Sequence, residues 1–171
     1  MVLSNKTSRA NRCILFDWGN TLMRVFPEFD APMFAWSKVE ALPQAMETLE
    51  TLSREWLLAV ATNTGASDQQ EIRAALDRVD LVQWLDKIYC YKMIGFKKPS
   101  RQFFGYILKD LGLDPSRVVM VGDDFENDVA GAVACGIKGI RLNIHTKETK
   151  QGFLYRTIHD LKDLPAALAL I

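Results

Sequence analysis

Short apolar runs alternate along this chain with segments of helical period, and this alternation most limits the possible folds. The runs predict strands at Cys13–Asp17, Leu57–Thr62, Lys87–Tyr91, Arg117–Val121 and Ile137–Leu142. Because a nearly continuous apolar run suits a strand that is covered on both faces, the runs favour a parallel sheet between helices. The sequence therefore predicts a three-layer α/β/α fold with a five-stranded, mostly parallel sheet.

The segments between the runs are predicted to be helices. Apolar residues recur at helical spacing over Pro43–Arg54, Ser67–Arg78, Ser100–Leu111, Asp124–Cys135 and Leu161–Leu170. Ser67 is a candidate N-cap, and Gly112 and Gly136 are typical of helix ends in the left-handed conformation. Residues 153–171 are accordingly expected to form a C-terminal tail helix.

Length and composition limit both the domain count and the partners. The 171 residues correspond to one domain over 1–171, since a domain usually has about 100–200 residues. Lys plus Arg and Asp plus Glu both number 21, so the net charge is zero and no nucleic-acid partner is expected. No apolar run approaches the roughly 18 residues of a membrane span, so no membrane partner is expected.

The cysteines and the first residues favour a cytoplasmic protein. Cys13, Cys90 and Cys135 are odd in number and far apart, which predicts reduced, half-buried thiols rather than a zinc site or disulfides. The segment Met1–Arg12 is polar and basic, unlike a secretory signal.

Chemically active side chains follow four of the predicted strands. They are an acid after the first, a hydroxyl and an amide after the second, a lysine after the third and an acidic cluster after the fourth: Asp17, Thr62, Asn63, Lys98, Asp123, Asp124, Glu126 and Asp128. The carboxyl ends of parallel strands share one edge of a sheet, where ligands bind. A carboxylate nucleophile, donors for equatorial oxygens and carboxylates for Mg²⁺ together suit phosphoryl transfer.

These four motifs, in this order, resemble those of the haloacid dehalogenase-like (HAD) hydrolases, whose fold is Rossmann-like. The resemblance implies that Asp17 is the nucleophile, that Thr62, with Asn63 beside it, binds phosphate, and that Lys98 neutralises charge there. It also implies that Mg²⁺ is bound by Asp17, the backbone carbonyl of Gly19, Asp123 and Asp128.

Several of these residues also have purely structural interpretations. Asp124 and Glu126 are better explained as acids at a helix N-terminus than as metal ligands. Thr62 and Asn63 could cap the following loop. Trp18 could face the substrate or pack in the core, and the sequence leaves both open.

The chain departs from the family pattern at Gly19. Most phosphatases of this family carry a second Asp there, two residues after the nucleophile, as general acid and base. Glycine has no side chain to move a proton, and such help is worth typically about 10²–10⁴-fold in rate. The substitution favours substrates whose leaving group departs readily as an anion, such as phenolic or acyl phosphates.

The intervals between motifs leave no room for a cap domain. About 40 residues separate Thr21 from Thr62, and one helix and one strand use half of them. The remainder, residues 23–42, contains Phe26, Phe29, Phe34 and Trp36. We expect a flap-like segment over the site or a patch that packs on another chain. An open site of this kind suits a large phosphorylated substrate or closure by a homo-oligomer.

The sequence therefore predicts a capless, Mg²⁺-dependent HAD-like hydrolase, a phosphatase or phosphotransferase acting through an aspartyl-phosphate on Asp17. The alternative is a catalytically weak or inactive member that binds a phosphorylated ligand or a protein. A dehalogenase or phosphonatase is disfavoured, because those relatives depend on a cap.

Overall fold

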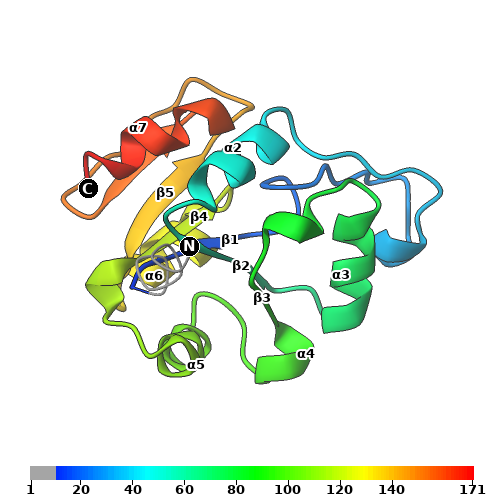
Figure 1. Cartoon of the computed structure of the whole chain (residues 1–171), viewed down its shortest axis with the longest axis horizontal. Helices are drawn as coiled ribbons and strands as arrows, with labels where there is room; N and C mark the ends of the chain where they lie inside the picture. Colours follow the sequence, from blue (N-terminus) through cyan, green and yellow to red (C-terminus); the bar gives the residue numbers. More distant parts are fainter. Residues whose placement is uncertain (1–10) are drawn as a thin grey trace, which may run out of the picture.

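A six-stranded, fully parallel sheet forms the centre of the protein. The computed structural model describes residues 11–171, so most of the Met1–Arg12 segment lies outside the described residues. The strand order is β3-β2-β1-β4-β5-β6 (Figure 1). The strands are β1 Cys13–Phe16, β2 Leu57–Thr62, β3 Lys87–Cys90, β4 Val118–Gly122, β5 Lys138–Leu142 and β6 Tyr155–Ile158.

The sixth strand corrects the prediction of five strands and of a tail that is only helical. β6 pairs with β5 at the edge of the sheet, and three of its four residues are only half-buried. An edge strand does not need apolar residues on both faces, so Tyr155–Ile158 lacks the continuous apolar run that marked the others. After β6 the chain forms η5 Leu161–Asp163 and α7 Leu164–Leu168.

Helices cover both faces of the sheet and create two separate cores. Successive β1 residues point to opposite faces, so Ile14 and Phe16 lie in one core and Cys13 and Leu15 in the other. α2 Ala45–Leu52, α3 Gln69–Asp77 and α7 contribute buried residues to the first core, and α5 Arg101–Leu111 and α6 Gly131–Val133 to the second (Figure 1). The predicted three-layer fold is confirmed.

The helix boundaries follow local capping. The N-cap of α3 is Asp68 rather than the predicted Ser67, because the Asp68 carboxylate accepts from the backbone N–H groups of Gln70 and Glu71. Glu71 bonds back to the Asp68 backbone, which completes a capping box. α5 ends at Gly112, whose φ of 64° is the left-handed conformation predicted from the sequence.

The segment 23–42 packs onto its own chain and contains one short helical turn, η1 Met33–Ala35. Phe26, Phe29 and Trp36 form an aromatic cluster with ring centroids 5.3–6.1 Å apart. Arg78, at the end of α3, donates to the carbonyls of Phe34 at 3.1 Å and Trp36 at 2.8 Å. Trp36 is only 8% exposed, so its ring is mostly buried within this chain and is not an exposed patch for another one.

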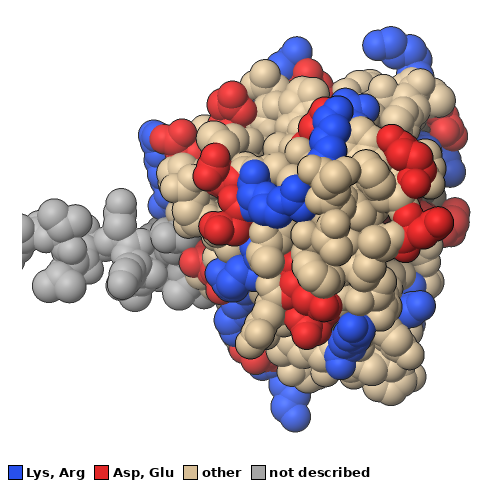
Figure 2. All heavy atoms as spheres, turned by 90° about the vertical axis from the view of Figure 1, so that its right-hand side faces the viewer, with Lys and Arg blue, Asp and Glu red and all other residues tan. Residues whose placement is uncertain are grey.

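The surface on the side of α3 carries both charges. Figure 2 shows this side with Lys and Arg interspersed among Asp and Glu and with uncharged areas between them. Among the described residues, no helix is long and apolar enough to cross a membrane.

Candidate active site

The predicted site residues meet at the carboxyl edge of the sheet, where β1 and β4 are neighbours. Asp17 follows β1 directly, and its backbone N–H donates to the carbonyl of Val121 in β4 at 2.8 Å. Asp123 follows β4 directly. The parallel register of the two strands therefore places the predicted nucleophile beside the predicted metal ligand.

Lys98 lies buried between two carboxylates. Its Nζ donates to Oδ1 of Asp17 at 2.7 Å and to Oδ1 of Asp128 at 2.6 Å, and its side chain is 2% exposed. Burial alone would lower the pKa of Lys98, but the charges of Asp17 and Asp128 outweigh it and raise the pKa. An ammonium has three donors, so two are used here and the third is available to a ligand.

Asn63 fixes the backbone of the loop that carries Lys98. Its Nδ2 donates to the Lys98 carbonyl at 2.9 Å, and its Oδ1 accepts from the Lys98 N–H at 2.7 Å. These contacts make Asn63 a positioning residue for Lys98; its predicted contact with substrate stays a prediction. Oγ1 of the neighbouring Thr62 accepts from the N–H of Thr64 at 3.3 Å, so its hydroxyl hydrogen can still be donated.

The carboxylates of Asp17, Asp123 and Asp128 form a cluster in which one oxygen of each lies within 4.8 Å of the others. Burial, with the nearby charge of Asp17, raises the pKa of Asp123. Burial likewise raises the pKa of Asp128 to about 7, against the attraction of Lys98. Burial is the main cause of both shifts, and the charge of Asp17 adds to them. A hard divalent cation with oxygen ligands, such as Mg²⁺, fits this donor set.

Gly122 allows Asp128 to approach the end of β4. A Cβ on Gly122 would lie 2.0 Å from Oδ2 of Asp128, a distance that no side chain could tolerate. The same Oδ2 accepts from the N–H of Asp124 at 3.1 Å. Asp128 is therefore held by backbone contacts on one side and by Lys98 on the other.

Asp124 caps the helix that follows β4, as the sequence predicted. This helix is a π-helical turn, η4 Phe125–Ala130, continued by α6. Oδ1 of Asp124 accepts from the N–H groups of Glu126 and Asn127, both at 3.0 Å, and Oδ2 accepts from Asn127 Nδ2 at 2.6 Å. Both oxygens of Asp124 are thus engaged within the turn.

Two adjoining cavities open at this edge. The acidic cavity, of about 240 Å³, is lined by Asp17, Asn63, Lys98, Asp123, Asp124, Asn127 and Asp128. The side cavity, of about 340 Å³, is lined by Asp17, Trp18, Gly19, Val25, Ala31, Pro32, Met33, Trp36, Thr62, Asn63, Thr64 and Ala66. Every predicted site residue lines at least one of them. Sequence reasoning missed Asn127, for which the only signal was its place in the fourth motif.

The side cavity shows what occupies the space at Gly19. A Cβ there would meet Cγ2 of Val25 at 2.8 Å, too close for an unchanged Val25. Val25 therefore fills the space that an acid–base side chain at position 19 would need. Its own backbone N–H donates to Oδ1 of Asn20 at 3.1 Å, which ties the turn together.

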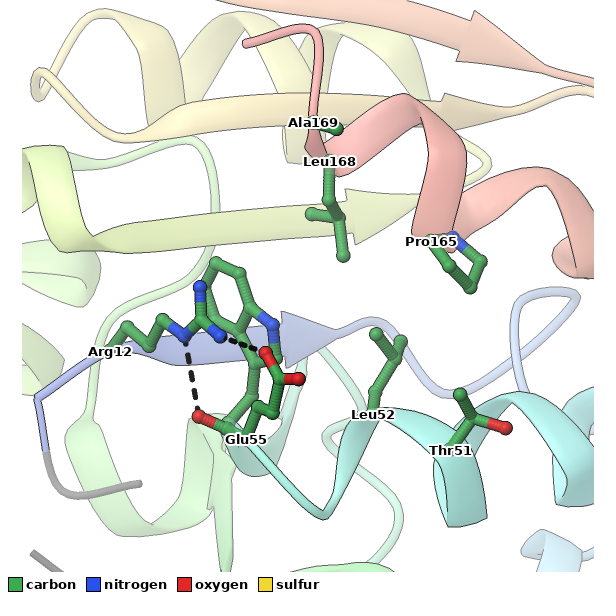
Figure 3. A pocket seen from close by; sticks show the side chains of 8 residues that line it. Arg12, Thr51, Leu52, Glu55, Pro165, Leu168 and Ala169 are labelled. Atoms are coloured by element: carbon green, nitrogen blue, oxygen red, sulfur yellow. Dashed lines mark hydrogen bonds and ion pairs between the residues drawn. The ribbon is translucent and has the colours of Figure 1, made fainter. Parts of the chain in front are cut away.

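A third cavity, of about 290 Å³, lies at the opposite end of the sheet, where β1 and β2 begin (Figure 3). Its Arg12 donates to the carbonyl and the carboxylate of Glu55 and stacks 4.2 Å from the centre of the Trp56 ring. The remaining lining residues come from α2 and α7. With Arg12 already paired, nothing in this cavity resembles the chemistry of the carboxyl edge.

Comparison with known proteins agrees with this geometry. A family model for haloacid dehalogenase-like hydrolases matches residues 20–136, which include Thr62, Lys98, Asp123 and Asp128. The pyrimidine 5'-nucleotidase YjjG of Escherichia coli (strain K12) is 32% identical over 128 residues, covering 72% of this chain and 56% of the relative. The glyceraldehyde 3-phosphate phosphatase of Methanothermobacter thermautotrophicus is 30% identical over 133 residues, covering 74% and 58%. The chain thus spans a little over half the length of these two relatives.

Solved structures show the same fold. An uncharacterized protein from Listeria monocytogenes serotype 4b superposes with a TM-score of 0.82 and 28% identity, covering 93% of this chain and 97% of that one. A 2-haloacid dehalogenase from Pseudomonas syringae pv. Tomato DC3000 gives a TM-score of 0.65 and 30% identity, covering 77% and 54%. With the motifs, the parallel sheet and the family match in agreement, this chain belongs to the haloacid dehalogenase-like hydrolases.

Proposed function

We propose that this protein is a Mg²⁺-dependent phosphatase that acts through a phosphoryl group carried on Asp17. The observation that supports this best is the buried Lys98, whose ammonium joins the carboxylates of Asp17 and Asp128 at the edge of the acidic cavity. The match to phosphatases among the relatives adds support for this reaction class.

In the proposed first step, a carboxylate oxygen of Asp17 attacks phosphorus in line with the leaving group. Lys98 engages Oδ1, and Oδ2 makes no hydrogen bond with the described residues, so Oδ2 is free to attack. The bond from phosphorus to the leaving oxygen breaks, and its electron pair departs with that oxygen. The third N–H of Lys98 and the Thr62 hydroxyl donate to phosphoryl oxygens.

Asp17, Asp123, Asp128 and the Gly19 carbonyl would hold Mg²⁺, which supplies positive charge to the transferring phosphoryl group. In the second step water attacks the phosphorus on Asp17, which releases inorganic phosphate and restores the carboxylate. No side chain at Gly19 takes the proton of that water. This absence favours a second candidate, a protein that binds a phosphorylated ligand and turns it over slowly or not at all.

A screen of phosphorylated compounds, with Mg²⁺ and with EDTA, tests both candidates. The phosphatase is supported by phosphate release that requires Mg²⁺ and is abolished in Asp17→Asn, with thermal unfolding as the check on folding. Tight binding of phosphorylated compounds without release of phosphate would instead select the binding protein. Hydrolysis that persists in Asp17→Asn would contradict the assigned nucleophile.

A further inference from the structure

We infer that the side cavity binds the leaving group, and that this group is an uncharged aromatic ring joined to phosphorus through a phenolic oxygen. The inference deepens the proposed function and depends on it. It concerns the substrate class, a small aryl monophosphate, which neither the family match nor the relatives' activities indicate.

The side cavity and the acidic cavity are connected at the predicted nucleophile. Asp17 and Asn63 line both, so the side cavity begins at the predicted nucleophile. A phosphoryl group beside Asp17, Lys98 and Thr62 would place its ester substituent next to the side cavity, which Asp17 and Thr62 line. At about 340 Å³, the side cavity lies at the small end of the roughly 300–1,000 Å³ range of small-molecule sites.

The walls of the side cavity carry little charge. Among the described residues that line the side cavity, Asp17 alone has a charged side chain. The polar lining residues are the consecutive Thr62, Asn63 and Thr64, and the large apolar ones are Trp18, Val25, Pro32, Met33 and Trp36. A second phosphate would find no cation there. A sugar would place most of its hydroxyls against the apolar walls, where they lose water and gain few partners, which is costly.

The indole N–H groups do not change this conclusion, because both are already bonded. Nε1 of Trp18 donates to Sδ of Met23 at 3.1 Å, and Nε1 of Trp36 donates to the carbonyl of Ala31. The two tryptophans therefore present ring carbons to the cavity. Ring faces and the Met33 thioether are favourable neighbours for another aromatic ring.

The aromatic and Met33 walls of the side cavity are held by contacts within the chain. Trp18, Met33 and Trp36 are buried, and Arg78 bonds the carbonyls of Phe34 and Trp36 onto α3. The walls are therefore held in place before a ligand enters, which lowers the entropic cost of binding.

The proton balance also favours a phenolic leaving group. Val25 fills the space beside Gly19, so no group there protonates the leaving oxygen. The leaving oxygen keeps the electron pair of the broken phosphorus–oxygen bond and departs as a phenolate, which then takes a proton from water. Hydrolysis of the phosphoryl group on Asp17 then consumes one water, so one aryl phosphate and one water yield one phenol and one inorganic phosphate.

A comparison of 4-nitrophenyl phosphate with acetyl phosphate tests the inference in the presence of Mg²⁺. Acetate is the better leaving group, so leaving ability alone predicts a higher kcat/KM for acetyl phosphate. The side cavity predicts the reverse order. Phenylphosphonate should likewise inhibit at least about tenfold more tightly than methylphosphonate, since an apolar contact is worth roughly 10–200-fold.

Met33→Gln should lower the ratio of kcat/KM for 4-nitrophenyl phosphate to kcat/KM for acetyl phosphate by about tenfold or more, because it places an amide in the apolar wall. The matched control is Met46→Gln, at an exposed position of α2, which should leave this ratio unchanged. Val25→Thr, at a partly exposed wall position, serves as a second variant if Met33→Gln fails to fold.

The outcomes separate this inference from the proposed function. The inference is supported if the protein prefers the aryl phosphate, if the wall variants Met33→Gln and Val25→Thr reduce this preference, and if Met46→Gln leaves it unchanged. Hydrolysis that favours acetyl phosphate, or an aryl preference that the wall variants do not alter, would overturn the inference while leaving the phosphatase intact. Absence of Mg²⁺-dependent hydrolysis of every phosphate ester and anhydride would instead remove the proposed function.

Discussion

Asp123 and Asp124 are neighbours in the sequence, but their carboxylates meet different partners. The Asp124 carboxylate accepts three hydrogen bonds from the turn that Asp124 caps. The Asp123 carboxylate lies near those of Asp17 and Asp128. Lys98 pairs with Asp17 and Asp128, so this cluster holds three carboxylates around one ammonium group. Two identical side chains thus differ in role because Asp123 directly follows β4, whereas Asp124 is the N-cap of the helical turn that begins at Phe125.

The first prediction at this scale concerns metal binding. Asp123→Asn should abolish Mg²⁺ binding or weaken it severely, because it removes a formal charge from a site with few protein ligands. Asp124→Asn is the matched variant and should change the affinity much less. Calorimetric titration with Mg²⁺ measures both, and a larger loss in Asp124→Asn would show that the assigned ligand is the wrong one of the pair.

The second prediction concerns Gly19. Gly19→Asp should raise activity on alkyl phosphates, by up to the roughly 10²–10⁴-fold that general acid–base catalysis supplies. Because the new Cβ would meet Val25 Cγ2 at 2.8 Å, the gain should be larger when Val25→Ala is combined with it. Rates on glycerol phosphate and 4-nitrophenyl phosphate, measured at matched Mg²⁺, give the two responses.

Val25→Ala alone is the control for the double variant. Val25→Ala removes an apolar contact from the side cavity, so by itself it should not raise the rate on glycerol phosphate, and any change should be a loss on 4-nitrophenyl phosphate. If wild type already hydrolysed both substrates equally well, another group would be donating the proton and the importance assigned to Gly19 would be refuted.

At the scale of elements, a polar contact joins β3 to α5. Oδ2 of Asp110 accepts from Lys87 Nζ at 2.6 Å and from the Tyr89 hydroxyl at 2.7 Å. These hydrogen bonds, from Lys87 first and Tyr89 second, lower the pKa of Asp110 below its usual 3.8. A lowered folded-state pKa means that the charged carboxylate stabilises the fold above the unfolded pKa and loses this effect as pH falls through the folded one.

Asp110→Asn should therefore lower the free energy of unfolding at pH 7, by less than about 1 kcal/mol because the Lys87 pair is exposed. The difference from wild type should begin to shrink below about pH 4, where the carboxylate of the unfolded chain starts to bind a proton, and should be lost as the pH falls through the lowered folded-state pKa. Urea unfolding at several pH values measures it, with Asp77→Asn on the exposed side of α3 as the control. A difference that grows toward low pH would contradict the assigned charge state.

At the scale of the whole molecule, the acidic cluster couples metal binding to stability. A cation that binds only the folded chain at 100 times its Kd adds about 2.7 kcal/mol. For a chain of this size that raises Tm by about 5–10 °C. We expect this rise with Mg²⁺ in wild type and its loss in Asp123→Asn.

The same variant should behave differently without metal. Asp123→Asn removes one of three crowded carboxylates, so in EDTA its Tm should equal or exceed that of wild type. A lower Tm in EDTA would show that Asp123 stabilises the fold by itself. Thermal scans in EDTA and in Mg²⁺ separate these two contributions.

The sequence alone determined the layers of the fold and most of the residues at the carboxyl edge. Continuous apolar runs mark strands that are covered on both faces, and parallel strands bring their following loops together whatever the loops contain. Asp17, Lys98, Asp123 and Asp128 could therefore be predicted to meet, since each follows such a run. β6 could not be predicted, because three of its four residues are only half-buried and its sequence forms no such run.

Only the tertiary structure decided how the side chains share their partners. Nothing in the spacing of Asn63 indicates that its amide holds the Lys98 backbone, a contact across 35 residues. Nor does the composition of segment 23–42 indicate that Val25 fills the space beside Gly19, or that Trp36 lines the same cavity as Asp17. Local patterns specify elements because hydrogen bonding and burial repeat along the chain. The shape and polarity of a cavity depend on side chains brought together from distant segments, and no local pattern encodes their packing.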